Sequence, residues 1–376
     1  MRIAVPAESR TYEARISATP DAIKKYIARG FEVVVQQGAG DGASITDADF
    51  TAVGASLASD FSSCCAGADL VLKVAAPDAK ELAKIPATAT LICLAAPFTN
   101  PHLGDYSAHG LRCFAMEMIP RISRAQSMDA LSSQANIAGY RAVLAALEHY
   151  PRFMPMLMTA AGTVKPARVL VMGAGVAGLQ AIATARRLGA LVEAFDVRSA
   201  AREQVESLGA SFVEVPAEEN AEDAGGYARE MSDDYQQKQA ALIAKHAAKS
   251  DIIITTALIP GRAAPVLITP AMVAQMRAGS VIVDMAVEMG GNCPLSVKDQ
   301  VIKHQGVTLV GITNLAALMA SDASQLFARN IANLVNLLWN EKENTLDINL
   351  DDEIIAGSLL CQHGEFLKPK LLENRP

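Results

Sequence analysis

The chain has 376 residues, of which 51% are hydrophobic and 19% are charged. This composition is typical of a soluble globular protein and excludes a disordered or fibrous one, and the length suits two domains with a core each. A formal net charge of −7 gives the molecule no electrostatic reason to bind nucleic acid or an anionic membrane surface.

Two long uncharged stretches are poor candidates for membrane spans. Prolines and polar residues interrupt the stretch from Ile85 to Gly104, and three glycines interrupt the stretch from Val169 to Ala185. The first residues match neither a signal peptide nor a transit peptide. We therefore expect no direct membrane insertion and a cytoplasmic location.

The cysteines and histidines do not follow a metal-binding spacing. The six cysteines include no CxxC pair, and the six histidines form no HExxH pattern. We therefore expect no metal site and reduced, mostly structural thiols.

The first third of the chain alternates short apolar runs with helical patterns, which predicts a parallel sheet. A first helix is expected from the cap Thr19 and Pro20 to Gly30. The predicted strands are Ile3–Val5, Phe31–Val35, Leu70–Val74, Leu91–Leu94 and Cys113–Met116. A second series follows at Arg168–Met172, Leu191–Asp196, Ile252–Thr255, Val281–Asp284 and Thr308–Gly311. The fold class is therefore α/β, with two doubly wound, Rossmann-like parallel sheets.

Two long helical patterns, Asp129–Tyr150 and Asp322–Glu343, bracket the second series of strands and are expected to join the domains. They predict an N-terminal α/β domain of residues 1–130 that is completed by residues from about 325 to 376. Residues 131–324, with the linking helix 129–150, are expected to form a nucleotide-binding domain. The alternative is that both are ordinary core helices of one large domain.

A glycine-rich turn follows the strand at Arg168–Met172, where Gly173, Gly175 and Gly178 fit the pattern GxGxxG. The first glycine makes the tight turn, the second lets a pyrophosphate approach the backbone, and the third lets helix and strand pack closely. Asp196 ends the next apolar strand, where its carboxylate can accept both ribose hydroxyls. A carboxylate there favours NAD(H) over NADP(H), although Arg198 could reverse that preference or simply pair with Asp196.

A polar loop from Pro120 to Ser132 leads into the first long helix. Composition leaves two interpretations open. In one, Asp129 or Ser127 caps the helix and the arginines are surface charges; in the other, the polar groups form a site.

The segment from Pro120 to Tyr140, together with Thr255–Gly261 and Gly290–Pro294, resembles the NAD(H)-binding component of proton-translocating NAD(P)+ transhydrogenase, and the resemblance covers nearly the whole chain. It implies that four loop residues hold the nicotinamide of NAD(H) against that of NADP(H) on a partner: Arg121, Gln126, Asp129 and Ser132. The expected cofactor-binding residues are Gly173, Ala174, Gly175, Val176, Gly178, Asp196, Val197, Arg198, Tyr227, Ala257 and Leu258.

Direct hydride transfer between two nicotinamide rings needs no side-chain acid or base, so orienting groups suit the chemistry. We expect the loop to face the glycine turn across a cleft between the domains. The resemblance also implies an NADP(H)-binding partner component, a membrane component, a homodimer, and a place on the cytoplasmic face of a bacterial inner membrane.

The acidic stretch 216–236 has the composition of a solvated surface segment. The resemblance suggests instead a mobile loop that closes over the nucleotide through Tyr227.

Alanine dehydrogenase is the alternative enzyme, because the transhydrogenase component resembles it. Arg15 and Lys73 match the substrate cations of the dehydrogenase, but Cys93 takes the place of its catalytic histidine and Glu288 that of its catalytic aspartate. The missing histidine and the polar loop favour transhydrogenase. A third hypothesis is a nucleotide-sensing module without turnover.

Overall fold

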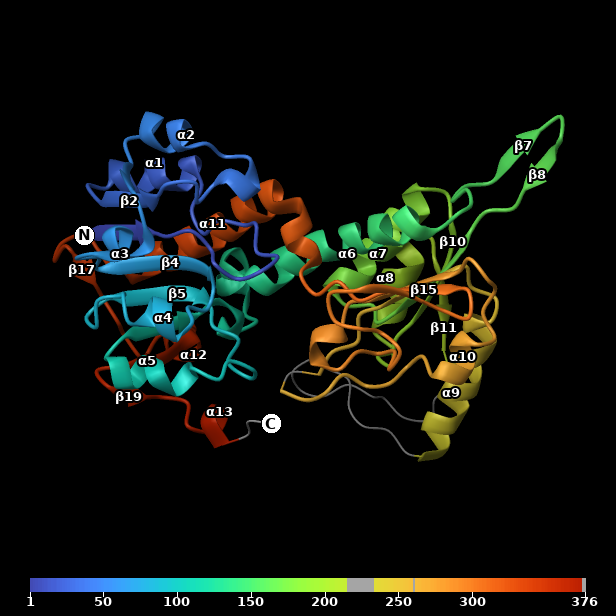
Figure 1. Ribbon diagram of the computed structural model, residues 1–376. Coiled ribbons are helices and arrows are strands. Elements are labelled where there is room, and N and C mark those ends of the chain that lie inside the picture. The colour runs from blue at the N-terminus through green and yellow to red at the C-terminus, as the bar shows by residue number, and fades with distance from the viewer. Residues whose placement is uncertain (215–232, 260, 374–376) are drawn as a thin grey trace. The chain divides into compact units, whose positions relative to one another are not determined.

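The computed structural model describes residues 1–214, 233–259 and 261–373. The chain divides into two compact units, Met1–Gln134 with Ala316–Pro376, and Ala135–Leu315. In each unit a sheet is packed against helices (Figure 1). The predicted α/β class with Rossmann-like parallel sheets is confirmed, while the domain limits expected from the sequence stay a prediction.

Within the described residues, the first unit has an eight-stranded sheet in the order β19-β18-β6-β5-β4-β1-β2-β3. The C-terminal tail supplies the two antiparallel strands at one side of the sheet, β18 and the edge strand β19, and the other strands are parallel. The strands are β1 (Arg2–Val5), β2 (Glu32–Gln36), β3 (Ser56–Ala58), β4 (Leu70–Ala75), β5 (Thr90–Leu94), β6 (Arg112–Ala115), β18 (Leu359–Gln362) and β19 (Glu365–Phe366). A separate small ribbon pairs β16 (Trp339–Asn340) with β17 (Thr345–Leu346).

Both faces of this sheet are buried under helices. Successive residues of a strand point to opposite faces and therefore belong to different hydrophobic clusters. Ile3 and Val5 lie in one cluster and Ala4 in the other. The helices are α1 (Pro20–Ala28), α2 (Asp47–Ala52), α3 (Phe61–Cys65), α4 (Ala79–Leu82), α5 (Leu103–His109), α11 (Ala320–Leu338), α12 (Glu353–Ser358) and α13 (Lys370–Glu373). Short 3₁₀ turns are η1 (Asp41–Ala43), η2 (Met116–Met118) and η3 (Ser123–Met128).

The described part of the second unit has a seven-stranded sheet in the order β11-β10-β9-β12-β13-β15-β14, of which only β14 is antiparallel. Its strands are β9 (Arg168–Met172), β10 (Leu191–Phe195), β11 (Ser211–Val213), β12 (Ile252–Thr255), β13 (Val281–Asp284), β14 (Val301–His304) and β15 (Val307–Val310). Its further elements are α7 (Val176–Arg187), α8 (Ala201–Ser207), α9 (Asp233–Ala247), α10 (Pro270–Val273), η4 (Val287–Met289) and the hairpin of β7 (Leu157–Thr159) and β8 (Gly162–Val164). The strand order reverses at β9, between β10 and β12, which is where ligands bind in such sheets.

The two long helices differ in where they lie. Helix α6 (Ala130–His149) runs through the division between the units at Gln134 and Ala135. Helix α11 lies wholly in the first unit, because its apolar stripe, including Phe327, belongs to that unit's core. The chain passes from the second unit back to the first between Leu315 and Ala316, in η5 (Leu315–Met319).

In the part of the chain that the structure describes, no helix combines the length and apolar character needed to cross a bilayer.

Candidate functional site: a glycine turn and a polar loop

The glycine turn connects β9 to α7 in the second unit. Gly173 has φ +100°, which disfavours any residue with a side chain. A Cβ at Gly178 would stand 1.8 Å from the carbonyl oxygen of Gly173, so this glycine is required for the helix to pack on the turn. Behind it, Gly139 of α6 is required in the same way, since its Cβ would meet the carbonyl oxygen of Ala177 at 2.1 Å.

Gly175 is different, because nothing in the protein requires a glycine there. Its φ of −77° is accessible to any residue, and an added Cβ would have no atom within 4 Å. It caps helix α7, whose first N–H groups and positive dipole end favour an anion. An open glycine at a helix N-terminus fits close backbone approach by a pyrophosphate.

The carboxylate of Asp196 lies beside this turn and is almost fully buried. Its oxygens accept hydrogen bonds from the backbone N–H of Ala174 at 2.7 Å and the backbone N–H of Arg198 at 2.9 Å. The guanidinium of Arg198 also pairs with the carboxylate, at 2.9 Å and 3.0 Å. Arg198 is therefore paired with the carboxylate, as one of its two expected roles requires, and its part in cofactor binding stays a prediction. Val197 lies between the two residues.

A third segment joins the glycine turn after β12. The hydroxyl of Thr256 donates to the carbonyl oxygen of Gly173 at 3.1 Å, which brings the next residues, Ala257 and Leu258, close to the turn. Leu258 is 47% exposed. The sequence pattern predicts no role for Thr256, although a hydroxyl directly after a buried strand could have indicated a contact with the neighbouring turn. Tyr227, in contrast, lies outside the described residues.

The polar loop of the first unit runs from β6 to α6. Asp129 precedes α6 and accepts from the backbone N–H of Ser132 at 2.9 Å and from its hydroxyl at 2.5 Å. This is a helix N-cap, one of the two interpretations left open by the sequence. A carboxylate has about four acceptor positions, so Asp129 can accept from further donors beside the two of Ser132.

The remaining loop residues are presented at the surface. Arg121 and Gln126 are exposed, and among the described residues the amide of Gln126 makes no side-chain hydrogen bond. Arg124, for which the sequence predicts no role, pairs with Asp352 at 2.7 Å and 3.0 Å and so fixes η3 to the N-cap of α12. All these residues belong to the first unit, whereas the glycine turn belongs to the second.

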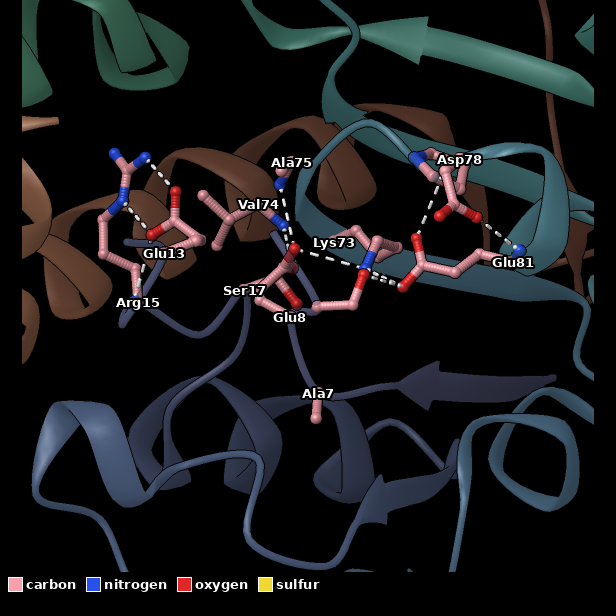
Figure 2. A network of polar contacts seen from close by, with 12 residues as sticks. Ala7, Glu8, Glu13, Arg15, Ser17, Lys73, Val74, Ala75, Asp78 and Glu81 are labelled. Carbon is pink, nitrogen blue, oxygen red and sulfur yellow. Dashed lines mark hydrogen bonds and ion pairs between the residues drawn. The ribbon is translucent and has the colours of Figure 1, made fainter. Parts of the chain in front are cut away.

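The side chain of Arg15 is bound by other residues of the first unit. Its guanidinium binds the carboxylate of Glu13 through two bonds of 2.8 Å and 2.6 Å, as Figure 2 shows, and donates to the side-chain oxygen of Gln134 at 2.8 Å. The side chains of Arg15 and Glu13 are 7% and 2% exposed, so the pair is withdrawn from solvent.

Lys73 lies on β4 between two glutamates, at 3.2 Å from Glu8 and 3.3 Å from Glu81 (Figure 2). Burial lowers the pKa of Lys73, but the two carboxylates outweigh it and leave that pKa above its ordinary value. Burial raises the pKa of Glu8 above its ordinary value, although the ammonium of Lys73 opposes this shift. Glu8 also accepts the backbone N–H groups of Val74 and Ala75.

Cys93 and Glu288 stand at the positions of the catalytic histidine and aspartate of alanine dehydrogenase. Cys93 is fully buried in the core, and Glu288 is exposed, within 3.4 Å of Lys298. All six cysteines lie in the described residues and are buried and unpaired. Among the described residues no group of three or more histidine, cysteine or acidic side chains could hold a metal ion.

Comparison with known proteins places the chain in one family. The profile described as "Alanine dehydrogenase/PNT, N-terminal domain" matches residues 4–138, and the corresponding C-terminal-domain profile matches residues 142–369. An NAD(P) transhydrogenase subunit alpha chain of Rhodospirillum rubrum is 50% identical over 379 residues, which cover 99% of each chain. A crystal structure of transhydrogenase from Sinorhizobium meliloti has a TM-score of 0.88 at 45% identity, covering 97% of this chain and 100% of that one.

Alanine dehydrogenase is more distant. The enzyme of Halomonas elongata is 32% identical over 339 residues, which cover 86% of this chain and 84% of the relative. The chain is thus more similar to the transhydrogenase component than to the dehydrogenase, which confirms the resemblance found in the sequence. It belongs to the alanine dehydrogenase/PNT family.

Proposed function

We propose that this chain is the NAD(H)-binding component of a proton-translocating NAD(P)+ transhydrogenase. It exchanges hydride with NADP(H) carried by a partner component. Similarity to transhydrogenase subunit alpha over 99% of the chain supports this assignment against alanine dehydrogenase. The observation that carries the nucleotide site is Gly175, which leaves the backbone at the N-terminus of α7 open to a ligand.

The residues of the second unit fit NAD(H). The N-terminus of α7 would receive the pyrophosphate, and Asp196 would accept the ribose hydroxyls while repelling a 2′-phosphate. Ala257 and Leu258 would line the nucleotide from the neighbouring strand end. When bound, the nicotinamide supplies the hydride chemistry itself.

The loop residues Arg121, Gln126, Asp129 and Ser132 are proposed to orient the nicotinamide. The exposed amide and guanidinium suit hydrogen bonds to a carboxamide, and the Asp129–Ser132 cap gives the loop a fixed end at α6. No proton moves with a hydride, so these groups are needed for orientation and not for acid–base catalysis.

The test is reconstitution with an NADP(H)-binding component. Mixing should restore hydride transfer between NADH and NADP+, and Gln126→Asn or Asp129→Asn should slow it by roughly tenfold with a modest loss of NADH affinity. If both variants transfer hydride at the wild-type rate, the loop has been misassigned. Steady conversion of alanine and NAD+ to pyruvate by the chain alone would favour the dehydrogenase instead.

A homodimer is part of the proposal, and the hairpin of β7 and β8 supports it. The hairpin forms its own two-stranded sheet and extends from the second unit (Figure 1). Met156 and Met158 are 58% and 70% exposed, and Phe153 just before them is 56% exposed. An isolated two-stranded ribbon is marginal in water, and clustered exposed apolar side chains mark association surfaces. A second copy of the chain is the occupant that we propose.

Met158→Glu tests this association. Sedimentation should show a shift from dimer to monomer at the same far-ultraviolet circular dichroism. An unchanged dimer in Met158→Glu would show that the hairpin is not part of the interface.

In the cell the assembled component is proposed to lie on the cytoplasmic face of the membrane that holds its membrane partner.

A further inference from the structure

The segment Gly290–Pro294 contributes to the family resemblance, but the proposed function gives it no task. Its central residue, Asn292, is fully buried in the second unit. The side-chain amide of Asn292 donates to the carbonyl oxygen of Ala257 at 2.9 Å and to that of Pro265 at 2.8 Å. Its side-chain oxygen accepts the backbone N–H of Ala257 at 3.1 Å. One side chain thus replaces a neighbouring strand for both polar groups of Ala257.

This clamp is needed because Ala257 lies beyond the sheet. Strand β12 ends at Thr255, where its ladder with β13 also ends. A backbone N–H or carbonyl withdrawn from water without a partner costs about 1–3 kcal/mol, and Asn292 supplies the partners that Ala257 lacks beyond the ladder. Thr256, next to the clamped residue, binds the glycine turn through its hydroxyl. The position of Ala257 and Leu258 relative to that turn is therefore fixed from both sides.

Asn292 is itself held by Asp284, the last residue of β13. Asp284 is fully buried, and its carboxylate accepts the backbone N–H groups of Asn292 at 3.1 Å and of Cys293 at 3.0 Å. It also accepts the hydroxyl of Thr255 at 3.2 Å and the N–H of Ala286 at 3.1 Å. A Cβ at Gly291 would stand 2.7 Å from this carboxylate, which explains the second glycine of the segment.

We propose that Asn292 is a positioning residue for nucleotide binding, which holds the backbone of Ala257 and Leu258 against the glycine turn. The inference rests on the proposed function, in which Ala257 and Leu258 contact NAD(H). Asn292 sets the affinity for the nucleotide without touching it, and Asp284 keeps the Asn292 backbone in place. Because the loop proposed to orient the nicotinamide is elsewhere in the chain, Asn292 affects binding more than the hydride-transfer step.

The experiment compares Asn292→Ala with Asp251→Asn. Asp251 is also a buried polar residue of this sheet, and it accepts the N–H of Arg168 at 2.9 Å, but at the opposite, amino end of β12. The variants are prepared in the full chain. Titration with NADH measures the dissociation constant, urea unfolding measures stability, and reconstitution with the partner component measures KM for NADH and kcat.

Asn292→Ala should raise the dissociation constant and KM for NADH by roughly tenfold or more, while kcat at saturating NADH changes by less than about twofold. Asp251→Asn should keep the wild-type affinity, because Asp251 lies at the opposite end of β12. If Asn292→Ala does not fold, Asn292→Ser, which keeps one hydroxyl, carries the same comparison.

Two results would overturn the inference: wild-type NADH affinity in the Asn292 variant, or an equal loss of affinity in Asp251→Asn. If the proposed function itself is wrong, the result is different: the wild-type chain does not bind NADH at all.

Discussion

The carboxyl ends of the two parallel sheets use polar residues in opposite ways. In the first unit, Arg15 and Lys73 are paired internally with Glu13, Glu8 and Glu81, so their charges are already neutralised. In the second unit, the corresponding edge presents glycines and backbone N–H groups, with Asp196 and Asn292 bonded to the backbone around them. The sheet of the first unit thus ends in buried ion pairs, whereas the sheet of the second unit ends at the turn where we propose that the nucleotide binds.

The difference shows how a site can be distinguished from a polar network. An anionic ligand at the first edge would have to displace glutamates that are bonded to the backbone as well as to the cations. At Gly175 a ligand displaces nothing, because the space beside the backbone is open. Residue type alone, arginine and lysine against glycine, would have suggested the reverse.

The largest effect is expected at Gly178. In Gly178→Ala the new methyl group would clash with the carbonyl oxygen of Gly173, so the second unit should lose about 4 kcal/mol or more of stability. Thermal unfolding and NADH titration measure the two losses. A variant that melts at the wild-type temperature would contradict the packing described for the turn.

Lys73→Met tests the buried ion pairs of the first unit. Removing the ammonium leaves the buried carboxylates of Glu8 and Glu81 without their cation, which should cost about 3–5 kcal/mol. Urea unfolding gives this loss, and NADH affinity at low urea should be unchanged. A strong loss of NADH affinity in a folded variant would show that the first edge takes part in nucleotide binding.

Glu117 adds a pH dependence to the first edge. Its carboxylate accepts the backbone N–H groups of Ala95 and Ala96 at 3.1 Å and 2.6 Å, and no described cation pairs with it. Burial raises the pKa of Glu117 from 4.5 to about 7 despite these donors. The folded state therefore holds the proton more tightly than the unfolded state, and this group's contribution to stability falls as the pH rises from 4.5 to 7.

Glu117→Gln should remove that contribution. The free energy of urea unfolding at about pH 5 and pH 7.5 should differ less in the variant than in the wild type. An identical difference in both proteins would mean that Glu117 does not titrate in this window.

The smallest change in stability is expected at Gly175. Gly175→Ala places its methyl group in open space, so unfolding should change by no more than about 0.5 kcal/mol, the cost of alanine at a helix N-cap. NADH affinity should nevertheless fall clearly. Unchanged NADH affinity would exclude this turn as the nucleotide site.

Much of the fold could be predicted from local pattern. Apolar runs such as Arg168–Met172 and Ile252–Thr255 coincide with the observed strands, since buried parallel strands are continuous and rich in branched residues. The hairpin of β7 and β8 could not be predicted this way, because its exposed strands carry no burial pattern. The first helix begins at Pro20 as expected, although the hydroxyl of Thr19 makes no capping bond.

The site was predictable only to a degree. The glycine turn and Asp196 follow a fixed local spacing, so the sequence indicates them directly. The bonds between Asn292 and Ala257 join residues 35 apart, and the pairing of Arg124 with Asp352 joins residues 228 apart. Such contacts depend on the order of strands and on the returning tail, neither of which a sequence pattern specifies.

Titration of the wild-type chain with NADH and with NADPH tests the central claim, that the open edge of the second unit is an NAD(H) site. Asp196 should repel the 2′-phosphate, and its pairing with Arg198 should keep that cation from reversing the preference. We predict that NADH binds much more tightly than NADPH. Equal affinities, tighter NADPH binding, or no binding of NADH would contradict the account.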